Sequence, residues 1–283
     1  MSGDAHAPYL LVSLASLRRH FDGEVIVHAW AESYDVISQI AEDKNLQISV
    51  QGRDPAYRGK NDQFLDKIRL MRSQDPQSAN LYLDADTFIT NPIDFLFEAI
   101  AIGGGFVATQ FGDWTTAGKI IQGRLNRLRE FPAAIDPVWI QLTIDNVYPS
   151  VNGGVFACSA NSPVLVAWER MTAAIVRDVF IADETVLHVL QPMYIPKSML
   201  VVLGGKFNCS PKHKPASLPD DAVAIWHGHG DSFLRPEKSA KGFDLWWPQF
   251  VQCCEKNVGN VNSWLSSINY KWLNQARSRI QCG

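Results

Sequence analysis

The sequence lacks the features that mark several other classes of protein. Among its 283 residues, no apolar run approaches the ~20 residues that a membrane-spanning helix needs. Residues 1–8 contain neither the basic nor the apolar region of a secretory signal. We therefore expect a cytoplasmic protein without a transmembrane segment, for which peripheral contact with a membrane stays open. The five cysteines include no C-x-x-C pair, which argues against a disulfide framework and a structural zinc site.

An excess of basic residues is also absent, because the formal net charge is −3. Residues 1–205 contain 16 Lys+Arg against 23 Asp+Glu, so they offer no basic stripe for a duplex backbone. Residues 206–283 contain 10 Lys+Arg against 6 Asp+Glu, a basic excess that would suit an anionic ligand. A hydrophobic content of 46% is enough for one large core. We expect a main domain over residues 1–242 and an aromatic-rich helical segment over 243–283 that packs on it.

Apolar residues at helical spacing alternate along the chain with short runs rich in β-branched residues. The pattern predicts helices over 9–20, 34–43, 64–75, from 91 onward, 119–129, 163–175 and 183–190, and strands over 24–30, 46–50, 81–83, 106–110, 151–158, 199–203 and 223–226. In the helix after Pro92, we expect Phe95, Leu96 and Phe97 to pack inward. This alternation indicates an α/β fold with a Rossmann-like, mixed but mostly parallel sheet flanked by helices.

Two aspartates directly follow the strand predicted over 81–83. Leu81 to Leu83 are apolar, as in a strand buried on both faces of a parallel sheet, and Asp84 and Asp86 come next. An unpaired buried carboxylate costs several kcal/mol, so a cation is expected beside this pair. A divalent metal that carries a phosphate ligand is the simplest candidate, since ligands bind at the carboxyl ends of such strands. Alternatively, Asp84 and Asp86 bind no cation and belong to a helix N-cap followed by a turn.

Several motifs in order along the chain resemble one family of GT-A-fold glycosyltransferases, which contains glycogenin, galactinol synthase and bacterial lipooligosaccharide galactosyltransferases (a family 8-like pattern). The resemblance covers residues 9–229. It rests on Lys67 within Asp66–Leu70, on Leu81–Thr87, on Asn91–Phe97, on Asn152–Phe156, on Asp183-Glu184 and on His227. It implies that residues 1–242 form a GT-A nucleotide-sugar-binding catalytic domain. The implied activity is hexosyl transfer from a nucleotide sugar, UDP-hexose in the first instance.

The resemblance assigns the metal ligands. Asp84 would contact both the ribose and the metal, while Asp86 and His227 would bind the metal directly. Two carboxylates and an imidazole fit Mn²⁺ better than an all-oxygen Mg²⁺ shell, although Mg²⁺ could substitute. The metal would act as a Lewis acid on the departing diphosphate. His229 is a competing candidate for the histidine ligand.

The resemblance also assigns the donor site. Lys67, Asn152 and Gly153 would contact the donor sugar, together with Asp183, and Asp4 and Tyr9 would lie near the nucleotide base. Two departures from the family pattern bear on this site. The chain opens with a helix where the family has a strand, and the Gly-x-Lys-Pro-Trp run expected after the histidine ligand is absent.

Asp183 and Glu184 are the candidate catalytic residues. Either carboxylate could act as the general base of an inverting reaction, whereas retention in this family involves attack on the same face of the sugar without an obvious nucleophile. We expect retention. Glu184 replaces the glutamine of the family pattern, which leaves the stereochemistry open.

Two other functions remain possible on sequence grounds. A sugar-phosphate nucleotidyltransferase also pairs aspartates with a metal, but no glycine-rich activating loop is present near the N-terminus. A non-catalytic protein that binds nucleotide sugars or glycans is the second alternative. The acceptor is not identified and could be a glycan, a lipid-linked saccharide, a protein side chain or a hydroxylated nucleobase.

The aromatic residues of the 243–283 segment have two interpretations. Their proximity to basic residues would suit a membrane interface. Tryptophan also packs well in any core, so these rings could instead cover the hydrophobic face of the sheet. The residues concerned are Trp246, Trp247, Phe250, Trp264, Tyr270 and Trp272.

Overall fold

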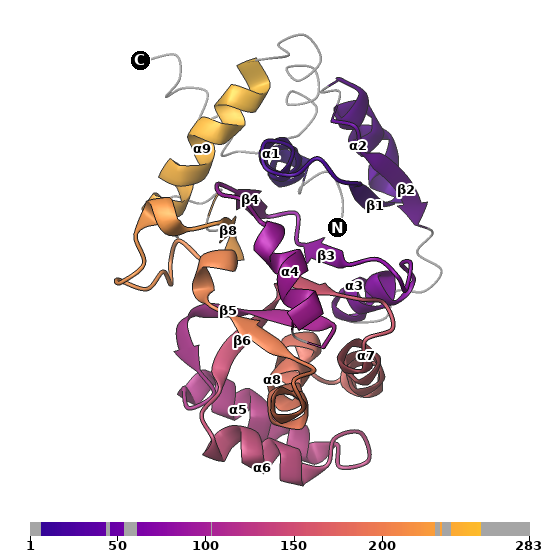
Figure 1. Ribbon diagram of the computed structural model, residues 1–283, viewed down its shortest axis with the longest axis vertical. Helices are drawn as coiled ribbons and strands as arrows, with labels where there is room; N and C mark the ends of the chain where they lie inside the picture. Colours follow the sequence, from indigo (N-terminus) through magenta and orange to yellow (C-terminus); the bar gives the residue numbers. More distant parts are fainter. Residues whose placement is uncertain are drawn as a thin grey trace.

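A computed structural model describes residues 7–43, 46–53, 61–102, 104–229, 233 and 239–255 (Figure 1). Helices and strands follow one another in this part of the chain largely as the periodicity predicts, but β4 and α6 were not predicted. The α-helices and strands are α1 (Ala7–Leu17), β1 (Ile26–Trp30), α2 (Ala31–Asp43), β2 (Ser49–Arg53), α3 (Gln63–Arg72), β3 (Asn80–Leu83), β4 (Thr87–Ile89), α4 (Asp94–Ile102), β5 (Phe106–Thr115), α5 (Lys119–Arg127), α6 (Pro137–Asp145), β6 (Pro149–Cys158), α7 (Pro163–Ile175), α8 (Ala182–Tyr194), β7 (Val201–Leu203), β8 (Ile225–His227) and α9 (Ala240–Glu255). Short 3-10 turns are η2 (Leu128–Glu130), η3 (Ile195–Lys197), η4 (Gly205–Phe207) and η5 (Asp220–Ala222).

The strands form a four-stranded sheet in the order β3-β6-β5-β7 and two separate pairs, β1-β2 and β4-β8. The β1–β2 and β5–β7 pairings are parallel. The β3–β6, β4–β8 and β5–β6 pairings are antiparallel. The predicted mixed α/β fold is confirmed, but the expectation of a mostly parallel sheet was wrong for the described strands.

The antiparallel pairing of β5 with β6 has a simple cause in the path of the chain. After β5 the chain makes an excursion through α5 and α6 and returns to the same end of the sheet, where the Thr116 amide donates to the Tyr148 carbonyl oxygen at 2.8 Å. Figure 1 shows α5 and α6 side by side at one end of the molecule. A connection that leaves and re-enters at one end joins antiparallel strands, whereas a crossover helix joins parallel ones. Alternating helices and strands in a sequence do not distinguish the two.

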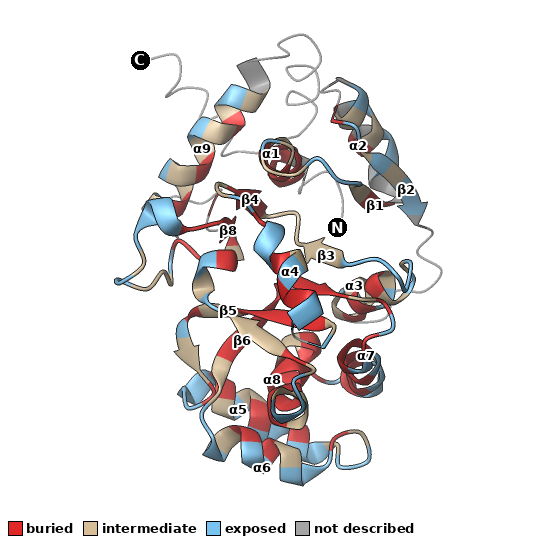
Figure 2. Ribbon diagram, viewed as in Figure 1, coloured by how far each residue is buried: buried red, intermediate tan, exposed pale blue. Residues whose placement is uncertain are grey.

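The largest part of the core lies between the four-stranded sheet and helices α3, α7 and α8, where red segments dominate in Figure 2. Trp168 of α7 is fully buried there and its ring packs edge-on against Phe106 and Phe156. The predicted helix over 163–175 is confirmed, and its apolar residues at helical spacing are all buried: Val164, Leu165, Trp168, Met171 and Ile175.

A second cluster joins α1, β4, β8 and α9. Trp246 and Phe250 of α9 are buried in it and their rings stack with centroids 4.9 Å apart. These two aromatics therefore follow the core interpretation of the C-terminal segment. Trp264, Tyr270 and Trp272 lie outside the described residues. No helix in the described ranges is both long and apolar enough to cross a membrane.

Two expectations about burial were wrong. Phe95 does not pack inward, since it is 47% exposed. Helix α4 begins at Asp94, and its buried face carries Leu96, Ala99 and Ile100, so Phe95 lies on another face. The strand before the aspartates is only partly buried over Leu81–Leu83. It is an edge strand, paired on one side with β6, and an edge strand has less cover than the central strands of a sheet.

Candidate functional site

The pairing of β4 with β8 brings the two aspartates to His227. Thr87, at the start of β4, pairs with His227, at the end of β8. Just before β4, the Asp86 carbonyl oxygen accepts a hydrogen bond from the Gly228 amide at 2.7 Å. Residues far apart in the sequence are thus fixed to one place by a backbone ladder. The turn between β3 and β4 then carries the Asp84 and Asp86 side chains beside the imidazole.

The three side chains form a compact group of oxygen and nitrogen ligands. His227 Nε2 lies 3.2 Å from Asp86 Oδ1 and 3.6 Å from Asp84 Oδ2, and one ligand atom from each residue lies within 4.8 Å of the others. The imidazole is buried, whereas the Asp84 and Asp86 side chains are 32% and 27% exposed. The group is therefore anchored in the core and open on its carboxylate side.

Asn208 sets the orientation of the imidazole. His227 Nδ1–H donates to Asn208 Oδ1 at 2.8 Å. The fully buried Asn208 amide in turn donates to Thr109 Oγ1 at 2.9 Å and to Asn152 Oδ1 at 3.2 Å. This network leaves Nε2 as the nitrogen that faces the carboxylates. In the neutral ring Nε2 carries a lone pair, so a proton or a metal cation must lie between it and the carboxylate oxygens.

The electrostatics of the group agree with that requirement. Burial opposes ionisation of both residues, but their mutual attraction prevails. The carboxylates of Asp86 and Asp84 raise the pKa of His227 above its ordinary value, and His227 lowers the pKa of Asp86 to about 2. The donor set of two carboxylates and an oriented imidazole therefore fits a divalent cation, which would take the place of the proton.

Two adjacent glycines let β6 approach the site. A Cβ at Gly154 would overlap His227 Cε1 and lie 2.6 Å from Asp84 Oδ2. A Cβ at Gly153 would lie 2.9 Å from Lys67 Nζ. Gly153 was expected at the donor site, but Gly154 was not singled out. A Gly-Gly pair inside a strand pattern is a sequence signal for close approach of the backbone.

A second group of charges lies on α3 and at the start of α8. Lys67 Nζ is 2.5 Å from Asp183 Oδ2, and the Asp183 side chain is only 1% exposed. Burial disfavours the charged lysine, but the carboxylate of Asp183 outweighs it and raises the pKa of Lys67 above its ordinary value. The indole of Trp168 donates to the Asp183 carbonyl oxygen at 2.8 Å, which ties the first turn of α8 to α7.

Glu184 belongs to this second group. Its carboxylate accepts a hydrogen bond from the Asn152 side-chain amide and lies 3.3 Å from Arg124 Nη1. Burial, followed by the negative charge of Asp183, raises the pKa of Glu184 to about 7, against the opposing charges of Lys67 and Arg124. At neutral pH this carboxyl is therefore poised between its two protonation states.

Further residues support these two groups and were not anticipated from the sequence. Tyr82 donates its hydroxyl to Asp84 Oδ1 at 2.8 Å. His188 links the Glu184 carbonyl oxygen, at 2.6 Å from Nδ1, to the Val151 amide, at 3.2 Å from Nε2. Burial lowers the pKa of His188 to about 4, so this ring is neutral and holds α8 to β6. The sequence could have indicated Tyr82, because it lies two residues before Asp84 and successive side chains of an extended chain alternate in direction.

The structure thus brings together Lys67, Asp84, Asp86, Asn152, Gly153, Asp183, Glu184 and His227. Tyr9 is placed differently. It lies on α1, is 3% exposed, and its ring centroid is 5.7 Å from that of Trp246 and 6.4 Å from that of Phe233. Its assignment to the nucleotide base stays a prediction. Asp4 lies outside the described residues.

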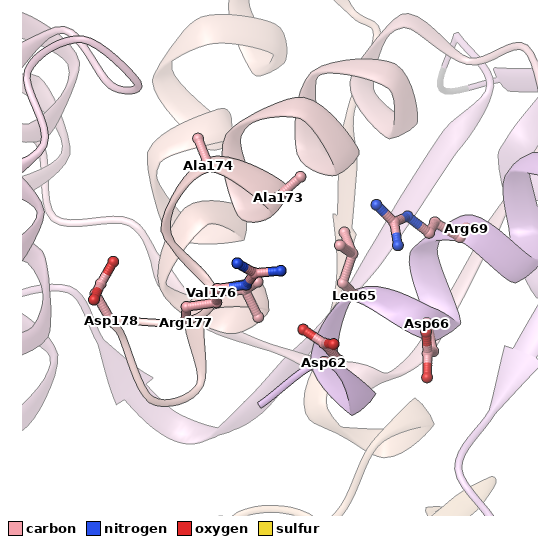
Figure 3. A pocket seen from close by; sticks show the side chains of 9 residues that line it. All are labelled: Asp62, Leu65, Asp66, Arg69, Ala173, Ala174, Val176, Arg177 and Asp178. Atoms are coloured by element: carbon pink, nitrogen blue, oxygen red, sulfur yellow. The ribbon is translucent and has the colours of Figure 1, made fainter. Parts of the chain in front are cut away.

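A separate pocket of about 340 Å³ lies between the start of α3 and the end of α7 (Figure 3). Acidic and basic side chains share its wall, with a small apolar patch between them. Its lining residues are Asp62, Leu65, Asp66, Arg69, Ala173, Ala174, Val176, Arg177 and Asp178. None of the predicted site residues lines it, so the metal-ligand group and the hollow are distinct features.

The fold that carries these groups is the GT-A fold of glycosyltransferases. No family model and no curated protein matches the sequence, so the likeness rests on solved structures. The galactosyltransferase LgtC, in complex with donor and acceptor sugar analogues, is similar with a TM-score of 0.56 and 16% identity, over 89% of this chain and 94% of LgtC.

Two other structures have the same fold. Mouse xyloside xylosyltransferase 1 is similar with a TM-score of 0.52 and 14% identity, over 81% of this chain and 94% of that one. The bifunctional glycosyltransferase WbbM is similar with a TM-score of 0.56 and 12% identity, over 91% of this chain and 50% of WbbM. Identities this low show a shared fold and leave the activity to be argued from the site.

Proposed function

We propose that the protein is a metal-dependent glycosyltransferase that moves a hexose from a nucleotide sugar, UDP-linked, to an acceptor hydroxyl with retention. The observation that carries the proposal is the group of Asp84, Asp86 and His227, placed on a GT-A fold beside a second group of buried charges. The glycosyltransferase structures with this fold, and the sugar analogues bound to LgtC, support it.

Asp84, Asp86 and His227 would hold the metal. Mn²⁺ suits this mixed oxygen and nitrogen set, and Mg²⁺ is the alternative. When bound, the ion would supply Lewis acidity to the oxygens of the leaving diphosphate. The protein's own contribution is preorganisation, because the ladder between β4 and β8 and the hydrogen bond from His227 to Asn208 fix the ligand directions before any ligand arrives.

Lys67, Asn152, Gly153 and Asp183 would orient the donor sugar. Because Gly153 has no side chain, the backbone of β6 lies directly beside the ion pair of Lys67 and Asp183. A charged pair that lines a site can exchange part of its mutual hydrogen bonding for sugar hydroxyls. Asp4 and Tyr9 remain proposed contacts of the base.

Asp183 and Glu184 would act nearest the reacting carbon. Burial raises the pKa of the Glu184 carboxyl to about 7, which suits proton transfer in either direction near neutral pH. We propose retention through attack on the same face of the sugar, with the carboxylates stabilising the oxocarbenium character that develops as the diphosphate leaves. Glu184 occupies the position of the family's glutamine, and a structure of an active-site glutamine-to-glutamate mutant of LgtC has the same fold as this chain.

Release of UDP from a panel of UDP-hexoses in the presence of Mn²⁺ tests the proposal. We expect turnover with at least one donor and its loss in excess EDTA. The anomeric configuration of a transferred product, measured by ¹H NMR, decides between retention and inversion. A nucleotidyltransferase would instead release pyrophosphate from a nucleoside triphosphate and a sugar phosphate, and a binding protein would bind donor without releasing UDP.

A further inference from the structure

A series of buried side-chain amides connects the metal-ligand group with Glu184. His227 Nδ1–H donates to Asn208 Oδ1 at 2.8 Å, and Asn208 Nδ2 donates to Asn152 Oδ1 at 3.2 Å. Asn152 Nδ2 then donates to Glu184 Oε1. Asn208 is fully buried and Asn152 is 7% exposed, so solvent has little access to these bonds. We call this series of hydrogen bonds the amide relay.

The Gly154 amide fixes the direction of the relay at Asn152. It donates to Asn152 Oδ1 at 2.7 Å, and only the oxygen of a side-chain amide can accept a hydrogen bond. Asn152 Nδ2 is therefore the atom that faces Glu184, and Asn208 must present its own Nδ2 to Asn152 Oδ1. The remaining polar atom of Asn208, its Oδ1, is the one that accepts from the imidazole.

Thr109 gives the same orientation of Asn208 independently. Its hydroxyl donates to the Val155 carbonyl oxygen at 2.6 Å, so Thr109 Oγ1 accepts from Asn208 Nδ2, at 2.9 Å. Every bond of the relay therefore points from His227 toward Glu184. Hydrogen bonds that point the same way polarise one another, by roughly 10–30% each, in surroundings of low dielectric constant. Positive charge added at His227 would thus strengthen the donation to Glu184.

Glu184 is balanced between its neutral and its ionised form. Its two oxygens accept from Asn152 Nδ2 and from Arg124 Nη1, the second at 3.3 Å. Both partners can only donate, which favours the carboxylate, whereas burial and the negative charge of Asp183 raise the pKa of Glu184 to about 7. The charged and titratable groups that face it come from four elements: Asp183 and His188 on α8, Lys67 on α3, Arg124 on α5 and His227 on β8. In such a balance, a bias of one pKa unit changes the ratio of ionised to neutral Glu184 about tenfold.

Resting on the proposed function, we propose that Asn208 and Asn152 are positioning residues that couple the proposed metal site to the charge of Glu184. Binding of a divalent cation beside His227 releases the proton of Glu184 to solvent, so Glu184 takes part in transfer as a carboxylate only in the metal-loaded protein. The Glu184 side chain is 19% exposed, which gives the released proton access to water. A glutamine does not titrate, so the coupling depends on the glutamate that this chain has at position 184.

The coupling is measured as the effect of Glu184 on Mn²⁺ affinity, because a cation that favours ionised Glu184 must bind more tightly when Glu184 is already ionised. Free Mn²⁺ is followed by EPR for wild type and Glu184→Gln, without donor, at pH values below and above the Glu184 pKa of about 7. Above it, wild type should bind Mn²⁺ about fivefold to tenfold more tightly than Glu184→Gln. Below it, the two affinities should converge. The metal ligands are the same in both proteins, so their own protonation cancels in the ratio.

Asn152→Ala interrupts the relay, and Thr109→Val is the matched control. In the Asn152→Ala background, Glu184→Gln should change the Mn²⁺ affinity above the Glu184 pKa by less than about twofold. Asn208 still orients His227 in that background, because Thr109 holds it. Thr109→Val removes a side branch of the relay and should keep the full ratio.

Difference infrared spectra give a second measurement, on wild type alone. Just below the Glu184 pKa of about 7, part of the protein carries a protonated Glu184, whose carbonyl band is missing from Glu184→Gln. Addition of Mg²⁺ should remove that band. A band that survives saturation with Mg²⁺, or an Mn²⁺ affinity ratio that does not change with pH, overturns the coupling. A ratio of wild-type size in the Asn152→Ala background overturns the role of the relay, because the effect then acts through space.

None of these measurements needs turnover, so the inference and the proposed function can fail separately. Wild type that binds Mn²⁺ but releases no UDP from any UDP-hexose refutes the proposed transferase, and the affinity ratios still decide the coupling. Turnover together with equal Mn²⁺ affinities of wild type and Glu184→Gln at every pH refutes the coupling alone. Wild type that binds no Mn²⁺ refutes both the metal site and the coupling.

Discussion

The site contains two pairs of carboxylates that the protein treats in opposite ways. Asp183 and Glu184 have cations supplied by the chain, since Lys67 and Arg124 lie within ion-pair distance. Within the part of the chain that the structure describes, the cationic partner of Asp84 and Asp86 is the His227 imidazole, and neither aspartate makes an ion pair with a lysine or arginine. The first pair thus has two cations from the chain, whereas the second pair needs a proton or a metal cation between its carboxylates and the imidazole. The contrast supports the position proposed for the divalent ion, because the presence of acidic residues alone would not distinguish the two pairs.

The contrast also separates catalysis from stability. A buried ion pair that loses one partner leaves an uncompensated charge in the core, which costs several kcal/mol. A ligand at a half-exposed group can be removed with little effect on folding. Substitutions in the first pair should therefore change stability and activity together, and substitutions in the second should change activity far more than stability.

The largest effect is expected for Asp86→Ala. Transfer should fall at least a thousandfold with saturating Mn²⁺, because one metal ligand is lost and the leaving diphosphate is stabilised less. The thermal midpoint without metal should fall less than that of Lys67→Met, because Asp84 still faces the His227 imidazole. Asp84→Ala should behave in the same way. Activity above about a tenth of the wild-type value in either variant would contradict the assignment of the metal site.

Lys67→Met should show the opposite profile. Removal of the ammonium leaves Asp183 buried without its ion-pair partner, and we expect a loss of about 3 kcal/mol in the free energy of unfolding, measured by urea titration. The double variant Lys67→Met/Asp183→Asn should recover part of that stability but no activity. Equal stability of Lys67→Met and wild type would break the distinction between the two pairs.

Asn208→Ala should weaken the metal site indirectly. His227 loses the acceptor that fixes its Nδ1–H, and we expect Mn²⁺ affinity, measured by EPR without donor, to fall about tenfold to a hundredfold. The matched control is Thr109→Val, which removes a partner of Asn208 but keeps the bond to His227. If the control lowers the affinity as much, the effect belongs to the network as a whole and not to the orientation of His227.

The smallest effect concerns Glu184 and pH. The folded-state pKa of about 7 lies above the ordinary value of 4.5, so the folded protein keeps a proton that the unfolded chain has lost. Wild-type stability should therefore decrease relative to Glu184→Gln as pH rises from 4.5 through 7, by about 3 kcal/mol, and level off above. Denaturant titrations of both proteins at several pH values measure this. A difference that is independent of pH would show that Arg124 compensates the charge fully.

Much of the fold could be predicted because it depends on local pattern. The buried face of α7, with Trp168 at its centre, follows from helical spacing alone. The group of Asp84, Asp86 and His227 was predicted from motifs and a family resemblance, and the β4–β8 ladder provides the physical reason for it. Strand direction was not predictable from alternation, because the excursion between β5 and β6 returns to its starting end.

The residues that sequence analysis missed share one property. Asn208 lies between η4 and β8, in no helix or strand, so no periodicity singles it out, and its importance arises only from partners distant in the chain. In the sequence, Arg124 is one of several basic residues of α5 and is not distinguished from the others. Its pairing with Glu184 depends on the packing of α5 near α8. Non-local hydrogen bonds and ion pairs of this kind leave no trace in a single sequence.

The ladder between β4 and β8 also imposes an order in time. His227 follows Asp86 by 141 positions, and at ~5–20 residues per second a ribosome needs roughly 7–28 s to span that interval. Throughout it the nascent chain holds two aspartates without their histidine, and β4 without the strand that pairs with it. Binding of the proposed metal by all three ligands would therefore wait until β8 has been synthesised, so acquisition of the ion would follow synthesis of this part of the chain.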